Sequence, residues 1–310
     1  MPEILGLPSG RKIGFAVYGP SDGIPMLFHH GWPSSATQAA VIEDQASRLG
    51  LQLVAVDRPG VADTSPLPGS ILADFSSDLS ALREHLGWKN FYVFGVSGGG
   101  PYALLTAARL SGVVACGVCC GAPLPEMIRR PGSILWIYRF LIFLVDRFPT
   151  FARITFAILR LGVRNLPGPL LSGLLRHFLP RPDALALKPL AIRRLVFAPV
   201  RRAFGQSTVH LLHDATRYLH PWGFDPTAIT TPTLFWHGEN DLNLPPALTR
   251  ELAQSIPNAS FTIFPNQGHY SLPLNLISQL LEELISILPL QSDSPTKDRI
   301  TSASTPELLK

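Results

Sequence analysis

The sequence predicts an α/β protein in which a mostly parallel, doubly wound sheet is interrupted by an all-helical insertion. Three observations predict this class. Short apolar runs of strand-like length alternate with helix-like segments over residues 1–121, and the alternation resumes after residue 225. The strand-like runs are apolar almost throughout, which is typical of parallel strands covered on both faces. Between these two stretches, helical patterns follow one another without a strand-like run.

The first half of the predicted core opens with three short apolar runs, at residues 13–18, 26–29 and 53–56. Glycine, proline or aspartate follows or precedes each run, and this combination predicts strands. Apolar residues at intervals of three and four then predict a helix over residues 74–86.

Residues 91–96 are again apolar and predict the next strand. A run of one serine and three glycines follows, and the alanine-rich segment 101–110 after it predicts a helix. The apolar run 113–120 predicts one more strand, and with it we close the first part of the core at residue 121. Three cysteines lie in this strand and are interpreted as small core residues rather than as metal or redox ligands: Cys116, Cys119 and Cys120.

Residues 122–225 are predicted to form the helical insertion, because a structureless loop of about 100 residues inside a compact fold is implausible. Its most apolar run, 134–145, contains Arg139 and falls short of the roughly 20 residues that a membrane helix needs. We therefore interpret this run as a buried or interfacial helix. Leucines and Phe178 predict a further short helix with one apolar face over residues 170–178.

The charge of the chain is concentrated in this insertion. It holds fifteen of the 26 Lys and Arg residues but only five of the 22 Asp and Glu residues. The arginines alternate with Leu, Ile and Phe rather than with polar residues, which argues against a nucleic-acid partner. Arg153, Arg160 and Arg164 share one stripe of a predicted helix over residues 151–164, and we interpret them as a solvated face. A weak contact between the basic insertion and a membrane surface is the alternative interpretation.

The sheet pattern resumes after the insertion, and we place the second part of the core at residues 226–290. Its predicted elements, in order, are a strand at 233–236, a helix at 247–255, a strand at 261–264 and a helix at 274–288. Residues 291–310 are rich in Ser, Thr, Asp and Lys without a periodic apolar face, so we expect a disordered tail. No secretory-signal pattern precedes the first strand, and with few cysteines this predicts a cytoplasmic protein.

A candidate nucleophile follows the strand 91–96. Gly95-Val96-Ser97-Gly98-Gly99 has the form G-x-S-x-G and stands between a predicted strand and a predicted helix, the context that this motif requires. On such a sharp turn the Ser97 hydroxyl lies above the carboxyl edge of the sheet. A serine hydroxyl becomes a good nucleophile only when a base lies within hydrogen-bond reach.

The base and its partner are sought at the same edge of the sheet. Among nine histidines, His269 stands out because it occupies a strand-to-helix loop near the C-terminus. The loop after the strand 233–236 offers Glu239 and Asp241 as the group that orients the imidazole, and we prefer Asp241. The order Ser97, Asp241, His269 is the nucleophile–acid–base order of one hydrolase fold.

These motifs resemble those of the α/β-hydrolase fold superfamily. The matching pieces are His30-Gly31-Trp32-Pro33, Asp57-Arg58-Pro59-Gly60, the serine motif, residues 237–241 and Gly268-His269. One departure is Ala62, at a position where the family often has glycine; we expect it to alter a loop and not the chemistry. The epoxide-hydrolase and dehalogenase branches have an aspartate where this chain has Ser97.

The resemblance implies further roles. The backbone N–H groups of Trp32 and Gly98 would form the oxyanion hole, with Trp32 and His30 beside the substrate. The insertion would be the helical lid that shapes the substrate pocket, and its aromatic residues suggest an apolar substrate: Trp136, Phe140, Phe143 and Phe156.

We therefore expect a serine hydrolase, with no metal or cofactor, that cleaves a carboxylic ester of an apolar small molecule through an acyl-enzyme. A carbon–carbon bond hydrolase, a thioester hydrolase or a perhydrolase on the same three residues remains an alternative. So does a ligand-binding protein that keeps the fold with little turnover. The sequence gives no indication of the oligomeric state.

Overall fold

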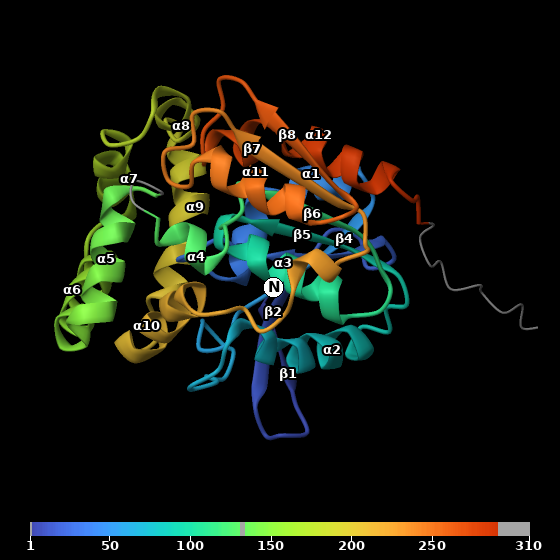
Figure 1. Ribbon diagram of the computed structural model, residues 1–310, viewed down its shortest axis with the longest axis horizontal. Helices are drawn as coiled ribbons and strands as arrows, with labels where there is room; N and C mark the ends of the chain where they lie inside the picture. The colour runs from blue at the N-terminus through green and yellow to red at the C-terminus, as the bar shows by residue number, and fades with distance from the viewer. Residues whose placement is uncertain (1, 131–133, 291–310) are drawn as a thin grey trace, which may run out of the picture.

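Eight strands form one sheet in the computed structural model, which describes residues 2–130 and 134–290 (Figure 1). The spatial order is β1-β2-β4-β3-β5-β6-β7-β8. The pairs β1–β2 and β2–β4 are antiparallel, and the five other neighbouring pairs are parallel. The predicted fold class, a mostly parallel sheet in an α/β protein, is confirmed. The strands are β1 (Pro2–Gly6), β2 (Lys12–Tyr18), β3 (Ile24–His29), β4 (Leu51–Val56), β5 (Phe91–Val96), β6 (Val113–Cys119), β7 (Thr233–Gly238) and β8 (Ala259–Phe264).

Helices cover both faces of this sheet. On one face, α2 (Ser76–His85), α3 (Gly100–Arg109) and α11 (Pro246–Ser255) contribute to an apolar core together with Val54 and Val56 of β4. On the other face, α1 (Glu43–Arg48) and α12 (Ser271–Ser286) form a second core with Leu53 and Ala55. Successive side chains of a strand point to opposite faces, so a strand covered on both sides must be apolar at every position.

Two elements of the core carried no usable pattern in the sequence. The edge strand β1 has mostly exposed side chains and is set by its pairing with β2, in register from Pro2 opposite Ala16 to Gly6 opposite Lys12. Helix α1 has six residues, which is too short for an apolar period to show. The predicted helix 74–86 begins with a 3-10 turn at Leu72–Phe75 and continues as α2.

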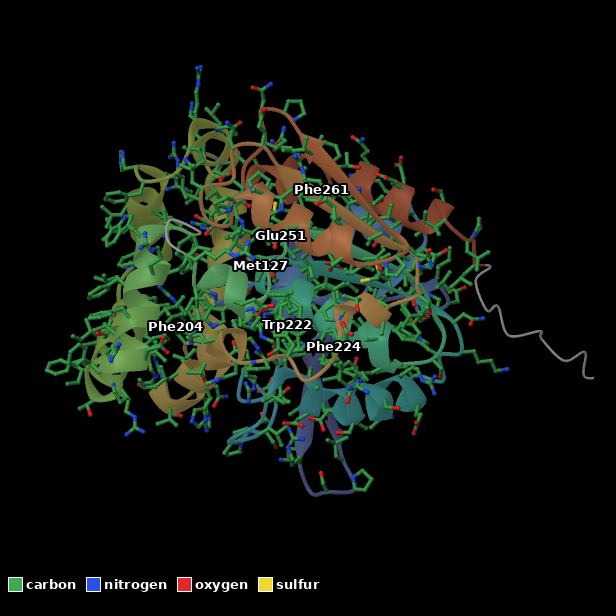
Figure 2. All side chains as sticks on the ribbon, in the orientation of Figure 1. Met127, Phe204, Trp222, Phe224, Glu251 and Phe261 are labelled. Atoms are coloured by element: carbon green, nitrogen blue, oxygen red, sulfur yellow. The ribbon has the colours of Figure 1, made fainter. Side chains whose placement is uncertain are left out.

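The helical insertion lies between β6 and β7, and its described residues form helices and no strand. Part of it has a small apolar core, to which Phe156 and Phe204 contribute. Phe204 is labelled in Figure 2. Over the described chain, no helix combines the length and the apolar character needed to cross a bilayer. The predicted tail, residues 291–310, lies outside the described residues. The helices are α4 (Pro125–Ile128), α5 (Trp136–Arg147), α6 (Pro149–Asn165), α7 (Gly168–Arg176), α8 (Arg181–Ala186), α9 (Leu190–Ala203) and α10 (Thr208–Thr216).

The predicted solvated arginine stripe of α6 is exposed at two of its three positions, Arg153 and Arg164. Arg153 is exposed, but the side chain of Arg160 donates to the carbonyl oxygens of Gln206 (2.7 Å) and Gly205. Arg164 also donates to the carbonyl of Gly205. Carbonyl groups near the end of a helix attract cations, and here two guanidinium groups fasten α6 to the loop between α9 and α10.

Candidate active site

Ser97 lies at the turn between β5 and α3. Its φ angle is +53°, in the left-handed region that non-glycine residues rarely adopt. The neighbouring glycines allow this turn, because a Cβ on Gly95 would overlap the backbone of Gly99, and one on Gly99 would overlap the carbonyl of His29. Strained backbone at a strand-to-helix turn is a feature of functional sites. The turn presents the Ser97 hydroxyl at the carboxyl edge of the sheet.

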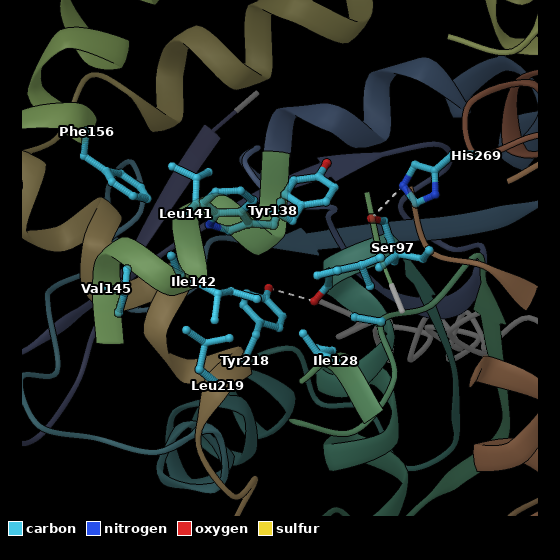
Figure 3. A pocket seen from close by; sticks show the side chains of 16 residues that line it. Ser97, Ile128, Tyr138, Leu141, Ile142, Val145, Phe156, Tyr218, Leu219 and His269 are labelled. Atoms are coloured by element: carbon cyan, nitrogen blue, oxygen red, sulfur yellow. Dashed lines mark hydrogen bonds between the residues drawn. The ribbon is translucent and has the colours of Figure 1, made fainter. Parts of the chain in front are cut away.

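The structure brings Ser97, His269 and Asp241 together. The Oγ atom of Ser97 lies 2.8 Å from Nε2 of His269 (Figure 3). Nδ1 of His269 lies 2.7 Å from Oδ2 of Asp241. These residues come from the turn after β5 and the loops that follow β7 and β8. A carboxylate only accepts hydrogen bonds, so Nδ1 carries the proton and Nε2 of the neutral ring accepts from the serine hydroxyl.

The environment of His269 favours its protonated form. Burial alone would lower the pKa of His269, but the charge and hydrogen bond of Asp241, with a further contribution from Asp183, outweigh burial and raise the pKa above the usual 6.5. The imidazolium that forms when His269 takes a proton is therefore stabilised in place.

Asp241, and not the alternative Glu239, faces the imidazole. Glu239 is exposed, whereas Asp241 is buried. Its Oδ1 accepts from the backbone N–H groups of Asn243 and Leu244, both at 2.9 Å, and its Oδ2 also lies 3.1 Å from Nε2 of His237. Burial would raise the pKa of Asp241, but His269 and His237 more than offset burial and lower it. Asp241 is thus held as a carboxylate in a fixed orientation.

Two predicted oxyanion donors lie next to each other. The backbone nitrogen of Trp32 lies 3.1 Å from the point that a Cβ on Gly98 would occupy. The carbonyl oxygen of Gly98 accepts a hydrogen bond from the Tyr218 hydroxyl at 2.8 Å (Figure 3). Because its carbonyl is held in this way, the peptide unit that follows Gly98 is fixed. Sequence reasoning did not single out Tyr218, which stands at the end of the insertion without a recognisable motif.

His30 does not reach the cavity, contrary to the expectation that it lies beside the substrate. It is fully buried, and its Nδ1 donates to the carbonyl of Gly31 at 2.9 Å. Burial and the nearby charge of Arg58 lower the pKa of His30 well below 6.5. His30 is therefore a neutral ring that holds the Gly31–Trp32 loop through its hydrogen bond to Gly31.

Two cavities meet at Ser97. The first, of about 110 Å³, is closed by apolar side chains from α5, α6 and the end of the insertion (Figure 3). The second, of about 230 Å³, extends toward α7 and α9 and includes Gln38 and Ser34. Trp32, Tyr138, Ser97 and His269 line both cavities. The apolar residues of the first cavity are Trp32, Ala122, Ile128, Ile134, Leu141, Ile142, Val145, Phe156, Ala215, Leu219 and Leu244.

The lid aromatics that suggested an apolar substrate divide into two groups. Phe156 is buried and lines the first cavity. Trp136, Phe140 and Phe143 point away from it and are 69%, 47% and 52% exposed. The sequence shows that α5 is apolar, but only the packing of the insertion decides which of its faces meets the cavity.

A buried ion pair ties the insertion to the loop that carries Trp32. Arg58 donates to both carboxylate oxygens of Asp214 on α10, each at 3.0 Å. The same guanidinium donates to the carbonyls of His30 (2.6 Å) and Gly31 (3.2 Å). Arg58 stands in the Asp57–Gly60 motif, but its partner Asp214 has no sequence signal because it lies 156 residues away.

A second contact ties the insertion to the loop of His269. The carboxylate of Asp183 on α8 is buried and accepts from the backbone N–H groups of His269, Tyr270 and Ser271 at 2.8–3.0 Å. The Ser271 hydroxyl also donates to Asp183 at 2.9 Å. Backbone N–H groups at a helix start lack intrahelical partners and attract a carboxylate, and here they come from the first residue of α12 and the two residues before it.

One group of possible metal ligands lies at this site. Cys120, Asp241 and His269 bring three ligand atoms within 4.8 Å of one another, the one such group found among the described residues. Burial raises the pKa of the Cys120 thiol well above 9.0, so the sulfur stays protonated. Asp241 and His269 already bond to each other. We interpret Cys120 as a neutral buried side chain next to the polar groups.

Ala62, the departure from the family pattern, keeps the backbone conformation of a glycine. Its φ angle is +42°, in the left-handed region. Its carbonyl accepts a hydrogen bond from the side chain of Gln206 in the insertion. Alanine holds this conformation at a cost of about 1 kcal/mol that glycine would avoid.

Comparisons with known proteins agree with this architecture. Residues 24–276 match the family described as alpha/beta hydrolase fold. A non-heme chloroperoxidase of Streptomyces lividans is 33% identical over 128 residues, which is 39% of this chain and 44% of that protein. A bifunctional esterase/perhydrolase of Acinetobacter calcoaceticus is 31% identical over 126 residues, 40% of this chain and 46% of that protein. The chain thus matches less than half the length of these curated relatives.

Among solved structures, an esterase from Thermogutta terrifontis superposes with a TM-score of 0.62 at 20% identity, covering 92% of this chain and 98% of that one. A bromoperoxidase from Bacillus anthracis gives a TM-score of 0.63 at 20% identity, covering 93% and 99%. At such identity the superpositions show the fold alone. The family match spans strands β3 to β8, the serine turn, the insertion and the His269 loop, and the chain belongs to the α/β-hydrolase fold family.

Proposed function

We propose that this chain is a serine esterase that hydrolyses carboxylic esters with an apolar acyl group. The observation that carries the proposal is the hydrogen-bonded series from Ser97 through His269 to Asp241, at 2.8 and 2.7 Å, at the mouth of an apolar cavity. These groups have the geometry that nucleophilic acyl transfer needs.

The reaction proceeds in two halves. The Ser97 oxygen attacks the ester carbonyl while Nε2 of His269 takes the hydroxyl proton, and the negative charge on the carbonyl oxygen is met by the N–H groups of Trp32 and Gly98. His269 returns the proton to the leaving alcohol, and an acyl-enzyme remains on Ser97. Water then attacks the acyl-enzyme with His269 again as base. The acid leaves and the serine hydroxyl is restored.

The two cavities suit different parts of the substrate. The first has an apolar wall apart from Ser97, His269 and two tyrosines, so it suits the acyl chain. The second offers Gln38 and Ser34 along with apolar residues and suits the alcohol part. Each methylene buried in the first cavity is worth about 0.8 kcal/mol, or close to a four-fold gain in kcat/KM.

A perhydrolase activity is the second candidate, because the relatives include a protein named bifunctional esterase/perhydrolase and a non-heme chloroperoxidase. In that reaction hydrogen peroxide attacks the same acyl-enzyme in place of water. The products are a peracid and the free Ser97 hydroxyl. The same three residues serve both reactions, so the nucleophile that reaches the acyl-enzyme decides between them.

The test is a panel of aryl esters of increasing acyl length, assayed for multiple turnovers with and without hydrogen peroxide. We expect kcat/KM to rise about four-fold per methylene until the first cavity is filled. Enzyme labelled with a fluorophosphonate on Ser97 is the control and should be inactive. Labelling of Ser97 without turnover of any ester would contradict the proposal and favour a ligand-binding role. Peracid formation that exceeds hydrolysis would favour the perhydrolase.

The pH dependence of the esterase follows from His269. The ring acts as a base only when neutral, and its pKa lies above 6.5 because Asp241 outweighs the effect of burial. We therefore expect kcat/KM to fall as the pH is lowered through this raised pKa, with the midpoint above 6.5. A pH–rate profile of a neutral ester gives this midpoint; one that lies below 6.5 would contradict the expected shift.

Asp183 is expected to act as a positioning residue for His269. In Asp183→Asn one of two acceptor oxygens becomes a donor, which breaks contacts to the loop, and the negative charge near His269 is removed. Loss of these contacts would displace the His269 ring and is expected to lower kcat/KM by about 10-fold to 100-fold. Loss of the charge should move the acid limb of the profile to lower pH, since Asp183 helps to raise the pKa of His269. Asp225→Asn, an exposed aspartate in the insertion, is the matched control. An unchanged midpoint would mean that Asp183 does not act on His269.

A further inference from the structure

The hairpin of α5 and α6 exposes an unusual amount of apolar surface. Trp136, Phe151, Ile158 and Leu161 are 61–69% exposed, and Phe140 and Phe143 are about half exposed. In Figure 1 the two helices lie at the edge of the molecule away from the sheet, and in Figure 2 their side chains project outward. We call this surface the hairpin face. Contiguous exposed apolar surface marks an interaction site.

The exposed residues form one continuous surface. On α5 they recur at intervals of four and three, and on α6 Phe151, Ile158 and Leu161 recur at seven and three, so each set shares one side of its helix. Phe148, at the turn, joins the two sets. Its ring centroid lies 5.6 Å from that of Phe143 and 6.2 Å from that of Phe151.

Helix α5 is apolar on two opposite sides. Tyr138, Leu141 and Val145 line the first cavity, whereas Trp136, Phe140 and Phe143 form part of the hairpin face. None of its residues is fully buried. A helix that is apolar all round is expected to have apolar surroundings on all sides, and here one side still lacks them.

The positive charge of the insertion indicates an anionic partner. Residues 136–203 hold twelve Lys or Arg and two Asp or Glu residues. Neither acid adds free negative charge, since Asp146 pairs with Arg129 and Asp183 is buried among hydrogen-bond donors. Arg139 and Arg147 of α5 are exposed. Aromatic and aliphatic side chains flanked by arginines suit the headgroup region of an anionic bilayer.

A second copy of the chain fits this surface less well. In a symmetric dimer the same strongly positive segments would face each other, and like charges across an interface are costly. A bilayer with anionic lipid supplies both the apolar depth and the opposite charge.

We propose that the hairpin face docks in the plane of lipid bilayers that contain anionic headgroups. Trp136 and the phenylalanines enter the boundary between headgroups and acyl chains, and the arginines contact the phosphates. Helix α5 then separates the bilayer from the first cavity. The proposal concerns binding alone and does not depend on the esterase activity.

The test is flotation of the whole chain with vesicles of phosphatidylcholine, with or without about 30% phosphatidylglycerol. We expect binding that requires phosphatidylglycerol and weakens as salt rises from about 0.1 M to about 0.5 M. The variant Ile158→Glu/Leu161→Glu should lower the partition coefficient at least about ten-fold. The control Ile4→Glu/Leu288→Glu changes two side chains of similar exposure, 56% and 58%, outside the insertion, with the same change of charge. It should bind as the wild type does.

Thermal melting followed by circular dichroism would check that both variants fold. Equal vesicle binding by the hairpin variant and the control would overturn the proposal, as would binding that ignores phosphatidylglycerol. Size-exclusion chromatography adds a third outcome. A dimer that the hairpin variant dissociates, in a chain that binds no vesicles, would assign the hairpin face to a second copy instead.

Discussion

Ser97→Ala is expected to lower kcat for aryl esters by at least about 10⁴-fold, the largest effect of any single substitution in this chain. The Oγ atom is the one that forms the bond to the acyl group, and alanine leaves His269 with nothing to deprotonate at 2.8 Å. Fluorophosphonate labelling should disappear at the same time. Steady-state kinetics and mass spectrometry of the labelled protein measure both effects.

The fold of this variant should be intact, because only an oxygen is removed from a half-buried side chain. Ser286→Ala, which removes an exposed hydroxyl from the end of α12, is the matched control and should keep wild-type kinetics. Ester turnover retained in Ser97→Ala would mean that another group is the nucleophile. The proposed mechanism would then be wrong even if the fold and the hydrogen bonds are as described.

Asp214→Ala is expected to produce the largest loss of stability, about 3–5 kcal/mol. The Arg58 guanidinium is fully buried, and Asp214 is its only carboxylate partner among the described residues. Burial alone would lower the pKa of Arg58, but the charge of Asp214 raises it, so the buried cation depends on that carboxylate. Without Asp214 an unpaired charge stays in the interior. Chemical denaturation with an unchanged m-value measures the loss.

The exposed pair of Arg129 and Asp146 provides the comparison. Its side chains are 40% and 36% exposed, and Asp146→Ala should cost less than about 1 kcal/mol because solvent screens the pair. Asp214→Ala should also raise KM or lower kcat, since Arg58 holds the carbonyls of His30 and Gly31 in the loop of Trp32. If both substitutions cost equally little, the Arg58–Asp214 pair is not what joins the insertion to that loop.

The sequence by itself determined the sheet, apart from its edge strand β1, and the turns at its carboxyl edge. Strands such as Phe91–Val96 are apolar at every position because both of their faces are covered, and a local pattern is enough to recognise them. Ser97 and His269 could be selected because each follows a strand within a few residues. The chain order of parallel strands places such turns at one edge. Their catalytic roles stay predictions that the substitutions above test.

Only the tertiary structure decided how the insertion meets that edge. The sequence favoured Asp241 and left Glu239 open, and only the fold places Asp241 against the imidazole. The inward side of α5 and the contacts of Asp183, Asp214 and Tyr218 likewise depend on side chains that meet across long separations in sequence. Helical periodicity shows that a face is apolar but not what covers it. For α5 the packing places one apolar side on the cavity and leaves the other exposed, because the neighbouring helices cover only the first.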